Sequence, residues 1–179
     1  MIDAAYLRSV VKDFRLYKSL GERAMAQVPT DVDFEALLGP ESNSIAMIVQ
    51  HIAGNFQSRF SNFLTTDGEK PDRDRDGEFE RRRPMTRESV MRLWDDGWAV
   101  ALKTLDALTP LDLNKTITIR GEGFLVVEAL NRSVTHTAYH VGQIVYLARH
   151  LAGDRWTSLS IPKGKSAEFN RTMKRPQSM

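Results

Sequence analysis

The feature that most constrains the fold is a helical spacing of apolar residues that recurs in four long stretches of the chain. Within each stretch the apolar side chains follow one another at intervals of three or four, which is the repeat of one face of an α-helix. The stretches cover residues 2–28, 44–64, 86–108 and 124–151. Long helices that each bury one apolar face are typical of a bundle. The sequence therefore predicts an all-α fold, an antiparallel up-and-down four-helix bundle.

Residues that begin or end helices stand at the edges of these stretches. Ser42, Asn43 and Ser44 are candidate N-caps of the second helix, and Thr86 is a candidate N-cap of the third. Gly153 follows the fourth stretch, where a glycine commonly ends a helix. These signals place the helix boundaries close to the limits of the apolar pattern.

Three segments lie outside the helical pattern. Residues 115–120 alternate β-branched and polar side chains, which predicts a short β-hairpin or strand between the third and fourth helices. Residues 67–83 are mostly charged, so we expect a long solvated loop with internal charge pairs. Residues 154–179 lack helical periodicity and predict an irregular C-terminal tail that partly packs back on the bundle. We expect a single domain over residues 1–172 and a flexible tail over residues 173–179.

The composition excludes several classes of protein. The chain has no cysteine, which removes disulfides, thiolate ligands and a cysteine nucleophile, and which suits a reducing compartment. The charged N-terminal residues do not resemble a signal peptide, and no window approaches the roughly 20 apolar residues of a membrane span. A net charge of +2 is too balanced to indicate nucleic-acid binding. We therefore expect a cytoplasmic protein that binds neither membranes nor nucleic acids.

The histidines form the main candidate for a functional site. His136 and His140 are four residues apart in the fourth helical stretch, so they differ by about 40° in direction and about 6 Å along the axis. His51 lies at the edge of the apolar face of the second helix, and in a bundle the two edges can meet. Three imidazoles match the ligand number of a catalytic zinc-type centre with an open position. Spacing alone leaves two alternatives open, metal ligands or histidines at the edge of the core.

Other motifs in the chain do not support a different chemistry. The residues between His136 and His140 include no glutamate, so the general base of the H-E-x-x-H zinc proteases is missing. Residues 72–77 match only the first half of a calcium loop, and residues 164–166 match only the end of a phosphate-binding P-loop. No G-x-S-x-G motif supports a serine nucleophile. The histidines remain the one constellation that carries chemistry.

The histidines and the residues around them resemble one known superfamily. His51, followed by His136-x-x-x-His140-x-Gly142-Gln143, is similar to the DinB-like (YfiT-like) superfamily of four-helix-bundle metalloproteins. The stretches TITIRGE, AYHVGQIVYLARHL and WTSLSIPKGKSAEFN resemble a bacterial branch of that superfamily that is named only as a domain of unknown function. The resemblance extends over about residues 1–172.

The resemblance implies a metal centre with His51, His136 and His140 as ligands. It also implies that Gly142 lets a neighbouring helix approach closely, and that Gln143 supports the ligands. The charged loop and the SIPKGKS segment of the tail would border the mouth of the site. Characterised relatives include transferases that join a low-molecular-weight thiol to an electrophile, and thiol-dependent maleylpyruvate isomerases.

Two functions follow as expectations. The first is a metal-dependent enzyme with a small-molecule substrate, in which zinc or nickel activates either a low-molecular-weight thiol or water, as in an S-transferase or a hydrolase. Asn55 and Gln143 are candidate orienting groups near the substrate. The second is a non-catalytic metal-binding protein or a homodimer, with an interface along the helix that carries Trp94 and Trp98, although tryptophans at this spacing are more often core residues.

Overall fold

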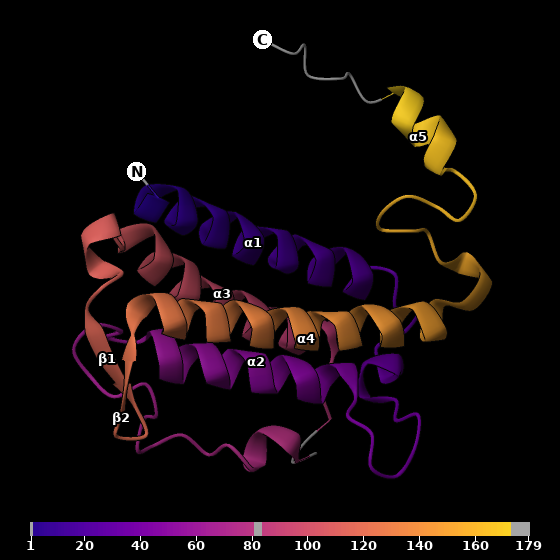
Figure 1. The fold of residues 1–179 in the computed structure, drawn as a ribbon. Coiled ribbons are helices and arrows are strands. Elements are labelled where there is room, and N and C mark those ends of the chain that lie inside the picture. Colours follow the sequence, from indigo (N-terminus) through magenta and orange to yellow (C-terminus); the bar gives the residue numbers. More distant parts are fainter. Residues whose placement is uncertain (1, 81–83, 173–179) are drawn as a thin grey trace.

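The computed structural model describes residues 2–80 and 84–172 and contains four long helices packed side by side (Figure 1). The long helices are α1 (Ile2–Met25), α2 (Ile45–Phe60), α3 (Arg87–Ala107) and α4 (Val126–Ala152). The prediction of an all-α four-helix bundle is confirmed. No helix in the described ranges is long and apolar enough to span a membrane.

The observed helix ends follow local capping chemistry. Ser44 caps α2, since its hydroxyl accepts the Met47 N–H at 3.2 Å, and Thr86 caps α3 in the same way. Gly153 adopts a φ of 55° directly after α4, so the expected C-terminal stop is correct. The second helix is shorter than its apolar stripe predicts, because Asn62 takes a left-handed φ of 52°.

Successive helices do not all run in opposite directions. The Thr104 hydroxyl near the end of α3 donates to the Phe60 carbonyl at the end of α2, at 2.9 Å, and Figure 1 shows both helices ending beside the hairpin. The Tyr6 hydroxyl likewise joins the start of α1 to the Val127 carbonyl at the start of α4. Thus α2 runs parallel to α3, and α1 runs parallel to α4. The predicted up-and-down order is therefore not observed between α2 and α3, because the connection formed by residues 61–86 is long enough to return along α2.

A two-stranded antiparallel sheet connects α3 to α4, as the sequence predicts. Strand β1 (Thr116–Ile119) pairs with β2 (Glu122–Leu125), and the register places Ile119 opposite Glu122. The turn consists of Arg120 and Gly121, both with positive φ values of 58° and 76°. Because β2 occupies residues up to Leu125, α4 begins slightly later than the apolar pattern suggests.

The core lies along the centre of the bundle and is rich in aromatic rings. Phe14 of α1, Phe56 of α2 and Trp98 of α3 form edge and tilted contacts with centroid separations from 4.9 to 6.1 Å. Trp94 and Trp98 are both fully buried. These two side chains are therefore core residues and cannot form an interface themselves, and a dimer along the exposed edge of α3 stays a prediction. The close packing of α2 on α3 depends on Gly97, where a Cβ atom would lie 2.8 Å from the Ala53 Cα.

The C-terminal tail is only partly irregular. A short 3-10 turn, η4 (Gly153–Arg155), follows α4, and a seven-residue helix, α5 (Ser166–Thr172), lies away from the bundle (Figure 1). Trp156 and Leu159 pack on the core as expected, whereas Phe169 is 40% exposed. No apolar stripe marks α5 because the helix buries no residue. The expected flexible segment, residues 173–179, lies outside the described residues.

Candidate metal centre

The bundle brings the three predicted histidines together from two antiparallel helices. The His51 Nε2 atom of α2 lies 3.0 Å from the His136 Nε2 atom of α4. One ring nitrogen from each of His51, His136 and His140 can be chosen such that all three lie within 4.8 Å of one another. His51 and His140 are buried, and His136 is half-buried. The spacing of four in α4 thus produces the convergence that the sequence predicts.

Hydrogen bonds on the opposite ring nitrogens orient two of these side chains. The His51 Nδ1 atom lies 2.8 Å from a carboxylate oxygen of Glu78, and the His140 Nδ1 atom lies 2.8 Å from the Gln143 Oε1 atom. Both partners are acceptors, so each Nδ1 carries the proton and each Nε2 carries the lone pair that can bind a metal ion. This is the arrangement in which histidine binds a metal ion while a carboxylate or amide holds the ring. In this structure the His51 Nε2 lone pair accepts a hydrogen bond from the His136 Nε2 atom.

The separation between the imidazoles fits ligands of one ion. Metal–nitrogen bonds of about 2.1 Å at tetrahedral or octahedral angles place two ligand nitrogens roughly 3 to 3.4 Å apart, and the observed His51–His136 separation is 3.0 Å. Burial, together with the nearby His140 and His51, lowers the pKa of His136 to about 3, and burial also lowers the pKa of His140. Both rings are therefore neutral at physiological pH, which is the form that binds metal.

Glu78 contacts the histidine centre from the crossing loop, residues 61–86, which connects α2 to α3 and runs back along α2. Burial alone would raise the pKa of Glu78, but hydrogen bonds from His51 and Arg73 lower it, so the group is ionised. Arg73 binds both carboxylate oxygens, at 2.8 and 2.9 Å. Gly54 makes room for this pair, because a Cβ atom at that position would lie 2.2 Å from the Glu78 Oε1 atom. A glycine one turn after His51 thus allows the carboxylate to contact the imidazole.

The expectation of a solvated loop at residues 67–83 is only partly correct. Internal charge pairs are present as predicted, but the loop is not simply solvated, because the side chains of Arg73 and Glu78 are only 5% and 9% exposed. The sequence analysis missed both residues, and residues 81–83 of the same loop lie outside the described part of the chain. No spacing rule relates Glu78 to His51, since a loop residue meets a helix residue only through the tertiary fold.

The remaining predicted residues have different positions. Asn55, one turn after His51, lines a cavity beside the histidines, and Gln143 also lines it while bonding His140. Gly142 does not mediate close helix packing, because a Cβ atom there would meet nothing within 4 Å. That expectation is wrong, and close helix approaches occur instead at Gly97, against Ala53, and at Gly21, where a Cβ atom would lie 2.5 Å from the Trp94 ring. The described part of the SIPKGKS segment does not line this cavity.

The cavity has a volume of about 840 Å³ and opens directly onto the three histidines. That volume suits a small molecule. Its walls come from α2, the crossing loop, the hairpin and α4, and they include Arg59, Arg73 and Arg120. Arg59 was not named from the sequence, although its position could have indicated it. It follows His51 and Asn55 at intervals of four, which places all three on the same helix face.

Comparisons with known proteins agree with this fold. A search of curated proteins finds no match. The crystal structure of a DinB-like protein from Bacillus cereus ATCC 10987 superposes with a TM-score of 0.54, covering 81% of this chain and 89% of that chain at 14% identity. This similarity shows a shared fold, and the resemblance stated from the sequence is confirmed. Residues 1–165 match the model of a family described as a protein of unknown function, DUF1572. The chain therefore belongs to the DUF1572 family and has a DinB-like fold.

Proposed function

We propose that this protein is a metal-dependent enzyme that binds a divalent ion through His51, His136 and His140 and acts on a small molecule. The observation that carries the proposal is the convergence of three histidine nitrogens within 4.8 Å at the wall of a cavity of about 840 Å³. A buried centre without access to a cavity would support a structural role instead. Imidazole donors suit zinc and nickel, and we propose one of these two as the bound ion.

Three protein ligands leave coordination positions open, which is typical of catalytic rather than structural centres. A bound divalent ion supplies Lewis acidity, which lowers the pKa of a thiol or a water molecule at such a position. The chain's own residues orient the site. Glu78 and Gln143 hold the rings of His51 and His140, and Asn55 faces the cavity, where its amide can hydrogen-bond a substrate.

The reaction class that we favour is transfer of a low-molecular-weight thiol to an electrophile, with hydrolysis as the second candidate. The chain contains no cysteine, so any thiol would have to come from the substrate. The DinB-like fold of the Bacillus cereus protein is compatible with this proposal but does not establish the reaction. A thiol substrate also suits a cytoplasmic location, which we propose with it.

Elemental analysis of protein purified without added metal provides the test. We expect bound zinc or nickel near one equivalent in the wild type, and loss of that metal in His51→Ala, His136→Ala and His140→Ala. His150→Ala is the matched control, because His150 is exposed in the last turn of α4 and lies outside the site. Unchanged metal content in the three variants would refute the ligand assignment.

The same variants separate a catalytic centre from a structural one. A far-UV circular dichroism spectrum that stays helical after metal loss supports a catalytic centre, whereas unfolding on metal loss supports a structural one. The transferase is assayed by following consumption of a low-molecular-weight thiol with a panel of electrophiles, using metal-loaded protein and the His136→Ala variant. Absence of any thiol consumption that depends on His136 would refute the transferase.

A further inference from the structure

The cavity beside the histidines has a strongly positive wall. Among the described residues that line it there are five arginines and no aspartate or glutamate. The arginines come from α2, the crossing loop, the hairpin and α4, and they are Arg59, Arg73, Arg75, Arg120 and Arg132. Residues this far apart in the sequence are brought to one wall by the tertiary fold rather than by a local run of charge.

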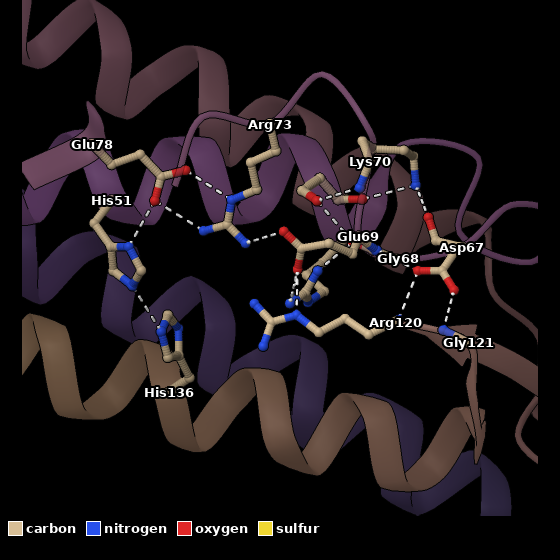
Figure 2. A network of polar contacts seen from close by, with 12 residues as sticks. His51, Asp67, Gly68, Glu69, Lys70, Arg73, Glu78, Arg120, Gly121 and His136 are labelled. Carbon is tan, nitrogen blue, oxygen red and sulfur yellow. Dashed lines mark hydrogen bonds and ion pairs between the residues drawn. The ribbon is translucent and has the colours of Figure 1, made fainter. Parts of the chain in front are cut away.

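One carboxylate, that of Glu69, contacts three of these arginines. Glu69 binds the Arg59 Nη2 atom at 2.8 Å and the Arg120 Nε atom at 3.1 Å, and it lies 3.6 Å from the Arg73 Nη1 atom (Figure 2). Burial alone would raise the pKa of Glu69, but the three guanidinium groups lower it. Glu78 adds a second negative charge at Arg73. Asp76 lies 3.8 Å from the Arg75 Nη1 atom, so three carboxylates against five arginines leave the cavity positive, a field that favours anions.

Arg120 is held so that its terminal amino groups are free for a ligand. Asp67 accepts the backbone N–H groups of Gly121 at 2.8 Å and of Arg120 at 2.9 Å, and these bonds hold the pKa of Asp67 below its usual range. The Nε atom of Arg120 is bound to Glu69, while its Nη atoms have no partner among the described residues. Figure 2 shows the guanidinium reaching away from the hairpin toward the side where His51 lies.

The backbone at Arg120 is unusual for its residue type. Arg120 and Gly121 form a two-residue hairpin turn with positive φ at both positions, where Asn-Gly or Gly-Gly is normally preferred. An arginine in the left-handed region costs conformational energy that asparagine or glycine would avoid. The side chain, by contrast, lines the cavity, and its two Nη groups have no partner among the described residues. A ligand contact gives this choice of residue a physical reason.

We propose that the cavity binds small molecules that carry an oxyanion group, a carboxylate or a phosphate, and that Arg120 contacts this group through its two Nη atoms. A planar guanidinium matches both oxyanions with two parallel hydrogen bonds. The remainder of the molecule extends past Phe79 and Tyr139, which also line the cavity, to the histidines. This substrate class rests on the proposed function, since it assumes that the reacting part lies at the histidine centre.

The test is isothermal titration calorimetry at fixed ionic strength with phthalate, phenyl phosphate and neutral benzamide as probes. We expect at least one anion to bind at least tenfold more tightly than benzamide, and the tighter anion identifies the preferred group. Arg120→Gln should weaken anion binding by about 10- to 100-fold, and Arg120→Lys should weaken it less. The matched control is Arg8→Gln, which removes the same charge from an exposed position on α1 outside the cavity and should leave binding unchanged.

Two results would overturn the inference. One is that neither anion binds more tightly than benzamide, and the other is that Arg8→Gln weakens binding as much as Arg120→Gln. Folding is not expected to interfere, because the Arg120 side chain is 57% exposed, and a urea midpoint for each variant checks this.

Metal-free and zinc-loaded protein distinguish this inference from the proposed function. Anion binding that depends on Arg120 in protein treated with a chelator supports the inference even if the histidines bind no metal, which would refute only the metal centre. Zinc binding without Arg120-dependent anion binding refutes only the inference. Anion binding that requires zinc and is unaffected by Arg120→Gln also refutes it, because the anion would then bind the ion.

Discussion

Replacing Glu78 with glutamine tests whether the crossing loop sets the affinity of the histidine centre for metal. The carboxylate accepts the His51 Nδ1–H at 2.8 Å and is almost fully buried. Hydrogen bonds to charged groups contribute about 1.5–3 kcal/mol and neutral ones about 0.5–1.5 kcal/mol. Glutamine keeps an acceptor oxygen but loses the charge, so we expect a loss of about 1–1.5 kcal/mol, roughly tenfold in zinc affinity. Alanine loses the acceptor as well, and the expected loss is about 10- to 100-fold.

Competition against a chromophoric zinc chelator at neutral pH measures this affinity directly. Glu122→Gln is the matched control, because Glu122 is an exposed carboxylate on β2 outside the cavity. Urea midpoints measured with a chelator present show whether the loss of one Arg73 partner has destabilised the fold. The reasoning is refuted if Glu78→Gln binds zinc as tightly as the wild type while His51→Ala has lost it.

Three further predictions concern stability and local packing. Below pH 6.5 the unfolded chain binds a proton at His136, whereas the pKa of His136 in the folded protein is about 3. The free energy of unfolding of the metal-free protein should therefore fall as the pH decreases, by up to about 1.4 kcal/mol per pH unit. Urea midpoints at pH 7.5 and 5 should show this drop, and it should shrink in His136→Gln. Gly54→Ala should displace the Glu78 carboxylate and so weaken zinc binding at least as much as Glu78→Gln does. Gly142→Ala is the control, because a Cβ atom there has no neighbour within 4 Å. It should leave zinc affinity unchanged and stabilise α4 by about 0.5–1 kcal/mol. Gly97→Ala should lower the free energy of unfolding by about 1–3 kcal/mol, since the new methyl group meets the backbone of α2, and an unchanged urea midpoint would contradict that packing.

The helices and the histidine cluster could be predicted from the sequence because both depend on local periodicity. Apolar residues at intervals of three or four define one face of each helix, and the same geometry places His136 and His140 on one edge of α4. His51 is the necessary complement because it occupies the matching edge of α2. The spacing of residues along each helix was sufficient to predict the helix faces and the histidine cluster. The structure places the ring nitrogens of His51, His136 and His140 together.

Gln143, the partner of His140 on the same helix, was named from the sequence, but Glu78 and the contacts of Arg120 could not be predicted because they depend on long-range topology. Glu78 contacts His51 across 27 residues, and Arg120 contacts Glu69 across 51. Charge patterning in residues 67–83 indicates a loop but not the surface on which the loop packs. The one available signal was the length of that loop, since two antiparallel neighbours would need only a short connection.

The parallel course of α2 and α3 connects the fold to the chemistry of the site. Two parallel neighbours in sequence force the chain to return along α2, and this return passes His51, where Gly54 leaves space for Glu78. The three histidines therefore lie on α2 and α4, whereas the charged wall of the cavity also includes residues from the crossing loop and the hairpin. It follows that the two properties are separable. Changes at Glu78 should alter metal affinity, and changes at Arg120 should alter which small molecule binds while the histidines keep their geometry.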